Sequence, residues 1–285
     1  METGMTYAIT GASGQLAGLA AERLVQAVDP AQVVLISRDP AGLDRFAGTD
    51  RRHGDFSRPD TLPAAFAGVD TLLLVSTDAV GVRLADQQAA IAAAAAAGVS
   101  RILYTSVPRP SADNPAGVVP DHAGTELALR ESGVAWTFLR NNLYADMQVD
   151  AVRQAAAAGR LVTNAGAGRT AYVTRADCAA AAVAAMVQDG HANRAYDITG
   201  PEAVSAADLA AFAARVSGAE VSVVDLDDAA YIAGLVSAGL PEPVADLLAS
   251  FGAATRGGYL AEVSTAVHDL TGQAPTSLRT VLQPA

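Results

Sequence analysis

A glycine turn between the first predicted strand and the first predicted helix constrains the fold more than any other feature of the chain. Tyr7–Thr10 has the composition of a short buried strand, and a helix is expected over about 14–28. Gly11 and Gly14 allow a tight turn and leave room for a large anion, to which the helix start offers free N–H groups. The strand, turn and helix together predict dinucleotide binding, and a purely structural turn is the alternative.

Short apolar runs alternate with helix-length segments through the rest of the first half. Further strands are expected at 33–37, 51–55, 72–76, 101–106 and 136–139, and helices at about 59–67, 83–98 and 121–132. The strands lack polar alternation, which is typical of a parallel sheet covered on both faces. The sequence therefore predicts an α/β fold with a doubly wound parallel sheet, of the Rossmann type.

The pattern changes after Tyr144. A helix is expected over about 146–158, strands at 172–174, 195–199 and 221–224, and helix over most of what remains. We interpret residues 1–145 as an NAD(P)-binding Rossmann domain. Residues 146–285 are interpreted as a smaller, mostly helical substrate-binding part, with segments near 171–199 that return to the Rossmann sheet.

The basic residues of the chain are unusual, because all 19 of them are arginine. Lysine Schiff-base chemistry and a P-loop nucleotide site, which needs a lysine, are therefore excluded. The formal net charge of −11 disfavours nucleic acid and anionic membranes as partners.

Several absences favour a cytoplasmic protein without metal or membrane association. The single cysteine, Cys178, excludes an internal disulfide, and the histidines lack metal-ligand spacing. The alanine-rich runs at 89–97 and 179–187 are too short to span a bilayer, and no leader-like segment is evident. We expect a monomer or a homodimer.

The end of the second strand indicates which coenzyme is bound. A carboxylate there would bind the ribose hydroxyl of NAD, but this chain has Ser37 and Arg38, followed by Asp39. A hydroxyl and a guanidinium suit a 2′-phosphate, so NADP(H) is the expected cofactor and NAD(H) is the alternative. A surface role for Arg38 is the alternative.

Motifs spread over nearly the whole chain resemble the NmrA-like branch of the atypical short-chain dehydrogenase/reductases, especially the type 2 NADPH-dependent quinone oxidoreductases and the triphenylmethane reductases. They are the glycine turn, Gly54-Asp55-Phe56, Tyr104-Thr105-Ser106, the run 137–144 and Leu270-Thr271-Gly272. The resemblance implies four groups of cofactor-binding residues. The pyrophosphate would be bound by Gly11, Ser13, Gly14, Gln15 and Leu16, and the 2′-phosphate by Ser37 and Arg38. The adenine would lie beside Asp55 and Phe56, and the nicotinamide beside Ser76, Thr77, Thr105 and Ser106. It also implies that Asn141, Asn142 and Tyr144 face the substrate cleft.

The usual proton donor of short-chain reductases, a tyrosine assisted by a lysine, cannot exist in this chain. His122 aligns with the lysine of related plant reductases and could donate a proton, or it could be a surface residue near a helix start. Ser106 could hydrogen-bond a substrate carbonyl or contact only the cofactor, and Tyr144 is a proton donor or a wall of the cleft.

Because the chain has few side chains that could donate a proton to the substrate, we expect acceptors that delocalise the electrons they receive. We therefore expect an NADPH-dependent reductase of small planar aromatic substrates, quinone-like or polycyclic, with an anthraquinone or aromatic polyketide tailoring step as one variant. A non-enzymatic NAD(P)-binding redox sensor is the alternative from another class.

Overall fold

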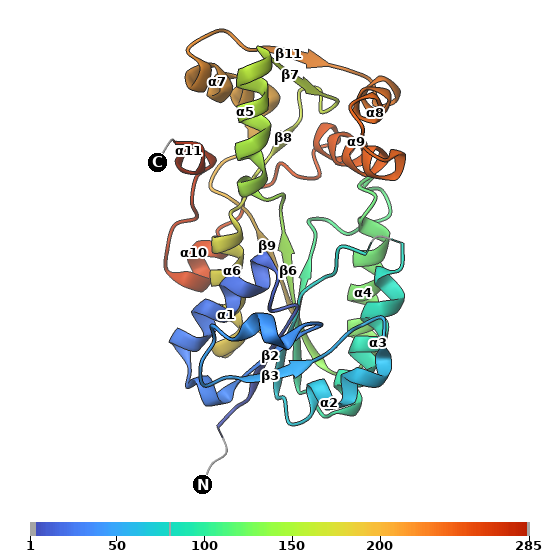
Figure 1. Ribbon diagram of the computed structural model, residues 1–285, viewed down its shortest axis with the longest axis vertical. Coiled ribbons are helices and arrows are strands. Elements are labelled where there is room, and N and C mark those ends of the chain that lie inside the picture. Colours follow the sequence, from blue (N-terminus) through green and yellow to red (C-terminus); the bar gives the residue numbers. More distant parts are fainter. Residues whose placement is uncertain (1–3, 80, 284–285) are drawn as a thin grey trace.

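A seven-stranded parallel sheet forms the centre of the molecule (Figure 1). The computed structural model describes residues 4–79 and 81–283. In spatial order the strands are β3 (Asp50–His53), β2 (Val33–Ser37), β1 (Tyr7–Thr10), β4 (Thr71–Leu74), β5 (Arg101–Ser106), β6 (Ala135–Asn141) and β9 (Arg194–Ile198). The order reverses between β1 and β4, and this switch point is where open α/β sheets bind their ligands. The predicted doubly wound fold is confirmed.

Helices cover both faces of the sheet, because successive strand residues point to opposite sides. On one side, Ile9 and Leu35 pack with α1 (Gln15–Ala27), α6 (Arg175–Val187) and α10 (Ala266–Thr271). On the other side, Ala8 and Val34 pack with the layer of α2 (Leu62–Phe66), α3 (Arg83–Ala96) and α4 (Val119–Glu131). The two layers flank the sheet in Figure 1.

A smaller part of the chain lies beyond one end of the sheet (Figure 1). Its elements are α5 (Gln148–Ala158), β7 (Arg160–Thr163), β8 (Arg169–Thr170), β10 (Val204–Ser205), α7 (Ala206–Ser217), β11 (Ser222–Asp225), α8 (Asp228–Ser237), α9 (Glu242–Arg256) and α11 (Leu278–Val281). β11 pairs in parallel with β7, and β10 pairs antiparallel with β8. Short 3-10 turns occur at Pro30–Gln32, Pro40–Leu43, Pro59–Thr61 and Ala145–Met147. No helix among the described residues has the length and apolar character that a membrane crossing requires.

The expected strand at 172–174 is wrong. Val173 makes only an isolated bridge with Tyr144, and its N–H donates to the Leu143 carbonyl. Thr174 ends the extended stretch, because its side chain caps α6 by accepting a hydrogen bond from the Asp177 N–H. Strand-forming residue types are therefore present here, but the extended segment before the helix cap is too short to form a β-ladder with a neighbouring strand.

Candidate functional site

The glycine turn leaves the start of α1 open. Gly11 has a φ of +63°, and its carbonyl accepts a hydrogen bond from the Gly14 N–H at 2.8 Å. Gly14 is the N-cap residue of α1 and has no side chain to satisfy the first helical N–H groups. A Cβ at Gly14 would lie 3.2 Å from the Gly11 carbonyl oxygen, so the turn is also tight. The open helix start can therefore receive an anion.

A cleft of about 500 Å³ follows this turn across the carboxyl ends of β1, β2 and β4. Its lining includes the residues assigned from the sequence to the pyrophosphate, the 2′-phosphate and the adenine, together with Ser76 and Thr77. Thr105 and Ser106 do not line it but face a neighbouring cavity. The structure thus brings most of the expected cofactor residues into one cleft.

Ser37 and Arg38 lie at the end of the cleft that β2 forms. The Ser37 hydroxyl is 3.0 Å from the Ser13 hydroxyl and accepts a hydrogen bond from the Asp39 N–H. The Asp39 carboxylate caps the following turn by accepting from the Ala41 N–H, so it is occupied locally. Arg38 is exposed and makes no ion pair within the described part of the chain. A guanidinium is therefore free at the place where a 2′-phosphate is expected.

Asp55 and Phe56 form the neighbouring wall of the cleft. The Asp55 carboxylate accepts hydrogen bonds from the Ser57 hydroxyl at 2.8 Å and the Ser57 N–H at 3.0 Å. The hydroxyl bond is the main cause that lowers the pKa of Asp55. Phe56 packs into the core beside α2. The wall is thus held by its own contacts and does not depend on a ligand.

A second cavity, of about 540 Å³, opens from the cleft toward the smaller part of the molecule. The two spaces share Ser76, Asp78 and Tyr144. The expected substrate-side residues all line it: Ser106, His122, Asn141, Asn142 and Tyr144. Apolar side chains from α5, α7 and α9 form much of the opposite wall, among them Leu209, Leu247 and Phe251. A planar apolar molecule in this cavity would lie beside the cleft that suits the coenzyme.

Three of these polar residues are already engaged with the protein. The Ser106 hydroxyl donates to Glu126 Oε1 at 2.8 Å, so the expected donation to a substrate carbonyl conflicts with this bond. Asn142 donates to the Leu260 carbonyl and accepts from the Leu143 N–H. The Tyr144 ring lies under the Arg175 guanidinium, and burial raises its pKa, which weakens it as an acid. Of the amides in the cavity, Asn141 has a buried Oδ1 without a partner among the described residues.

His122 is buried, with 4% of its surface exposed, so the interpretation as a surface residue is wrong. Its Nε2 lies 3.0 Å from Arg83 Nη1 and its Nδ1 lies 2.7 Å from the Tyr104 hydroxyl. Because a guanidinium only donates, Nε2 accepts and the ring proton is on Nδ1. Burial, and then the nearby Arg83 charge, lower the pKa of His122 to about 3. The ring is therefore uncharged at neutral pH, which argues against the expected role of His122 as a proton donor.

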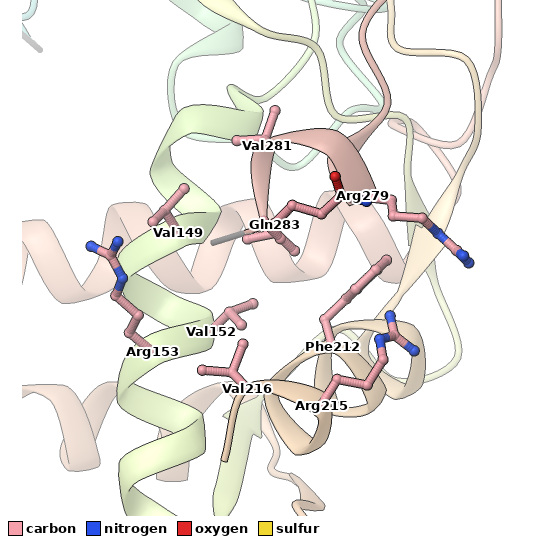
Figure 2. Close-up of a pocket in the computed structure, with 10 residues that line it drawn as sticks. Val149, Val152, Arg153, Phe212, Arg215, Val216, Arg279, Val281 and Gln283 are labelled. Atoms are coloured by element: carbon pink, nitrogen blue, oxygen red, sulfur yellow. The ribbon is translucent and has the colours of Figure 1, made fainter. Parts of the chain in front are cut away.

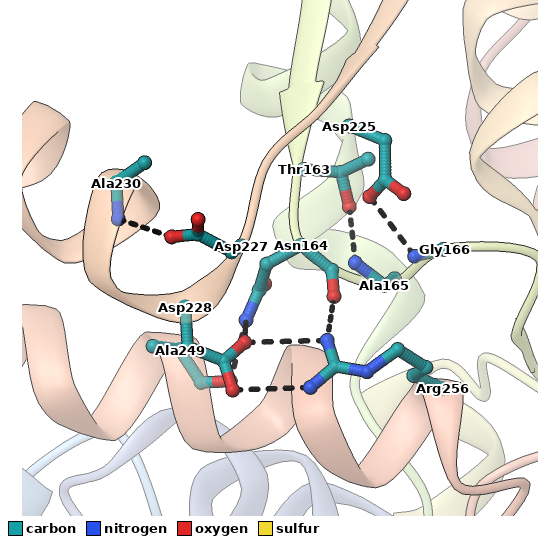
Figure 3. Close-up of polar contacts among 10 residues, drawn as sticks. All are labelled: Thr163, Asn164, Ala165, Gly166, Asp225, Asp227, Asp228, Ala230, Ala249 and Arg256. Carbon is teal, nitrogen blue, oxygen red and sulfur yellow. Dashed lines mark hydrogen bonds and ion pairs between the residues drawn. The ribbon is translucent and has the colours of Figure 1, made fainter.

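A polar network fixes the roof of the cavity, where β7 meets α8 and α9 (Figure 3). Asn164 Nδ2 donates to Asp228 Oδ1 and to the Ala249 carbonyl, both at 2.8 Å. Arg256 pairs with Asp228 at 3.0 Å and also donates to the Asn164 carbonyl. Asp227 caps α8 through the Ala230 N–H. These carboxylates have structural partners, and no cluster of three or more metal-ligating side chains occurs in residues 4–79 and 81–283.

A third cavity, of about 510 Å³, lies apart from the site. Val149 and Val152 of α5, Phe212 of α7 and Val281 of α11 surround it (Figure 2). It shares no lining residue with the cleft or with the second cavity. It therefore takes no part in the candidate site.

Comparison with known proteins agrees with this geometry. A family model described as NAD(P)H-binding matches residues 11–189. Quinone oxidoreductase 2 of Escherichia coli (strain K12) is 37% identical over 273 residues, which cover 95% of each chain. A crystal structure of an NADPH-dependent quinone oxidoreductase from Escherichia coli, complexed with NADPH, superposes with a TM-score of 0.93 at 36% identity, covering 97% of this chain and 98% of the other.

The triphenylmethane reductase of Citrobacter sp., complexed with NADP(H), is also similar. It has a TM-score of 0.88 and 33% identity, and the match covers 98% of this chain and 99% of the other. The resemblance inferred from the sequence motifs is thereby confirmed.

Proposed function

This chain belongs to the NAD(P)H-binding family and is an NAD(P)H-dependent oxidoreductase, and on that premise we propose that it transfers hydride from NADPH to a quinone-like, planar aromatic acceptor. The observation that carries the proposal is the continuity of the anion-receiving cleft with a largely apolar cavity through Ser76, Asp78 and Tyr144. A coenzyme in the cleft would present its reactive end to a substrate in the cavity.

We assign the parts of NADPH to residues of the cleft and, at the nicotinamide end, also to Thr105 and Ser106 of the neighbouring cavity. The proposed pyrophosphate site is the open helix start after Gly11 and Gly14. Ser37 and Arg38 would hold the 2′-phosphate, and Asp55 with Phe56 would flank the adenine. Ser76, Thr77, Thr105 and Ser106, at the carboxyl ends of β4 and β5, would surround the nicotinamide half. The bound coenzyme supplies the hydride, and the protein orients it and excludes water.

The acid groups of the cavity favour a delocalised acceptor. No lysine is present, His122 is held neutral, and burial raises the pKa of Tyr144. An ordinary ketone needs a strong proton donor when it receives hydride, whereas a quinone spreads the incoming electron pair over its ring. Asn141, Asn142 and Tyr144 would form polar walls around such a ring. The apolar walls also suit a polycyclic aromatic acceptor, as in an anthraquinone tailoring step.

A direct assay tests the function. NADPH is mixed with the purified protein and a panel of neutral quinones or simple aliphatic ketones, and the absorbance of the reduced nicotinamide is followed. Oxidation of NADPH is expected with the quinones and not with the ketones. Binding of NADPH without turnover of any quinone would contradict the enzyme and favour a redox sensor.

The 2′-phosphate assignment makes a separate prediction. Arg38→Glu replaces an unpaired guanidinium with a repelling carboxylate, so the Kd for NADPH is expected to rise about 100-fold, while that for NADH changes about twofold or less. Calorimetric titration of both coenzymes measures the two values. Arg23→Glu makes the same charge change at an exposed position of α1 and should leave both nearly unchanged. Equal weakening of NADPH and NADH would refute the assignment.

A further inference from the structure

Arg83 is a buried cation without a balancing carboxylate. It is the first residue of α3, and 5% of its surface is exposed. Its Nη1 donates to His122 Nε2, but its Nε is buried and has no partner among the described residues. No ion pair joins it to any carboxylate in residues 4–79 and 81–283. An uncompensated buried charge is strongly destabilising, so its presence here suggests a functional role.

The surroundings of Arg83 do not neutralise it. His122 is neutral, and Tyr104 is kept protonated because burial raises its pKa. Glu126 lies on the next helix, but its carboxylate already accepts hydrogen bonds from Arg130 and Arg140. Asp78 is the carboxylate in the described lining of the same cavity, and it forms no ion pair with Arg83. The positive charge of Arg83 is therefore available to a molecule that binds in the cavity.

The position of Arg83 is in the wall of the substrate cavity. It lines the same 540 Å³ space as Ser106, His122 and Asn141, and it is the one arginine in the described lining of that space. His122 accepts a hydrogen bond from Arg83 Nη1 and is itself hydrogen-bonded to the Tyr104 hydroxyl. These two contacts hold the guanidinium in place. A fixed, poorly solvated cation is the arrangement that stabilises a negative charge formed during a reaction.

We propose that Arg83 binds an oxygen of the acceptor and stabilises the negative charge that hydride transfer creates on it. The proposal rests on the proposed function. A quinone that receives hydride at one carbonyl oxygen becomes a hydroquinone monoanion, with the charge on the other oxygen. That oxygen then takes a proton from water, so the products are the hydroquinone and oxidised coenzyme. Arg83 would stabilise charge but would not donate a proton, because a guanidinium stays protonated, so the restriction to delocalised acceptors still holds.

The same charge makes Arg83 a determinant of specificity. A cationic dye loses its positive charge when it accepts hydride, and before that step an enclosed guanidinium repels it. A neutral quinone gains negative charge and is attracted more strongly as the reaction proceeds. This chain should therefore reduce neutral quinones in preference to cationic triarylmethane dyes, and Arg83 should set that preference.

The test compares Arg83→Met and Arg83→Lys with Arg153→Met, which removes an exposed arginine of α5. Arg83→Met is expected to lower kcat/KM for a neutral quinone about 100-fold and to leave kcat/KM for a cationic dye unchanged or higher. Arg83→Lys should recover part of the quinone activity, and Arg153→Met should match the wild type. Quinone activity of Arg83→Met within about threefold of the wild type would overturn the proposal.

A binding measurement separates this proposal from the proposed function. A chromogenic nitrophenol is titrated with coenzyme-loaded protein at a pH equal to the solution pKa of the phenol. The wild type should shift the absorbance toward the phenolate and Arg83→Met should not, whether or not any quinone is reduced. A wild-type protein that binds the nitrophenol without stabilising its phenolate would overturn the role of Arg83, even if the Met variant failed to fold.

Discussion

Glu126→Ala is expected to lower the free energy of unfolding by about 3 kcal/mol, because it leaves a paired arginine without its counter-charge inside the protein. Glu126 has 1% of its side chain exposed. Arg140 of β6 donates to both of its oxygens, at 2.9 and 2.8 Å, and Arg130 and Ser106 each add a further bond. The carboxylate thus joins α4 to the ends of β5 and β6, beneath the substrate cavity.

Urea unfolding followed by circular dichroism at pH 7 measures this loss. Asp150→Ala is the matched control, because Asp150 and Arg153 form an ion pair on α5 with side chains that are 81% and 71% exposed. Exposed pairs of this kind contribute about 0.5 kcal/mol or less. A loss at Glu126 as small as the loss at Asp150 would show that Arg140 finds adequate solvation or another partner, and the structural role given to Glu126 would fail.

The parts of the fold that local sequence determines could be predicted. The turn from β1 to α1 needs Gly11 and Gly14 for backbone reasons that the sequence carries directly. The buried strands could also be predicted from their apolar runs, since β2 and β5 have the bounds expected for them, Val33–Ser37 and Arg101–Ser106. The residues assigned to the cleft follow from these elements, because parallel strands end at the same edge of the sheet.

The second half was harder to predict, because long-range pairing decides its structure. β7 at Arg160–Thr163 was missed: it has an exposed and half-buried pattern, and its partner β11 lies about sixty residues further along the chain. Tyr172–Thr174 has strand-forming residues, yet the helix cap at Thr174 prevails. Elements of two to four residues carry little periodicity of their own.

The chemistry of single side chains in the site could not be read from the sequence. Arg83 was missed because an arginine at a helix start is ordinarily solvated, and only the contact with His122, 39 residues away, shows its burial. The burial of His122, which the sequence left as a proton donor or a surface residue, could not be predicted for the same reason. The one available signal was indirect: a chain without lysine needs another cation if its reaction creates a negative charge.

The burial of His122 has a measurable consequence for stability at acidic pH. Its pKa in the folded protein is about 3, whereas the ordinary value is 6.5. Between these two pH values the unfolded chain binds a proton at His122 and the folded protein does not. The contribution of His122 to the free energy of unfolding is therefore fully present above about pH 6.5 and is lost as the pH falls toward 3. The free energy of unfolding is expected to fall by about 1.4 kcal/mol per pH unit from this residue alone, or about 5 kcal/mol in total.

A variant that cannot titrate isolates this contribution from that of the carboxylates. In His122→Gln the amide oxygen can still accept from Arg83, and the difference between the unfolding free energies of wild type and variant is measured by urea denaturation from pH 7 to pH 4. The wild type should lose about 3 kcal/mol more than the variant over this range, because only its unfolded state gains the imidazolium proton. His268→Gln alters an exposed histidine and should follow the wild-type profile. Parallel profiles for the wild type and His122→Gln would mean that His122 takes up its proton in the folded state, and the neutral ring assigned beside Arg83 would then be wrong.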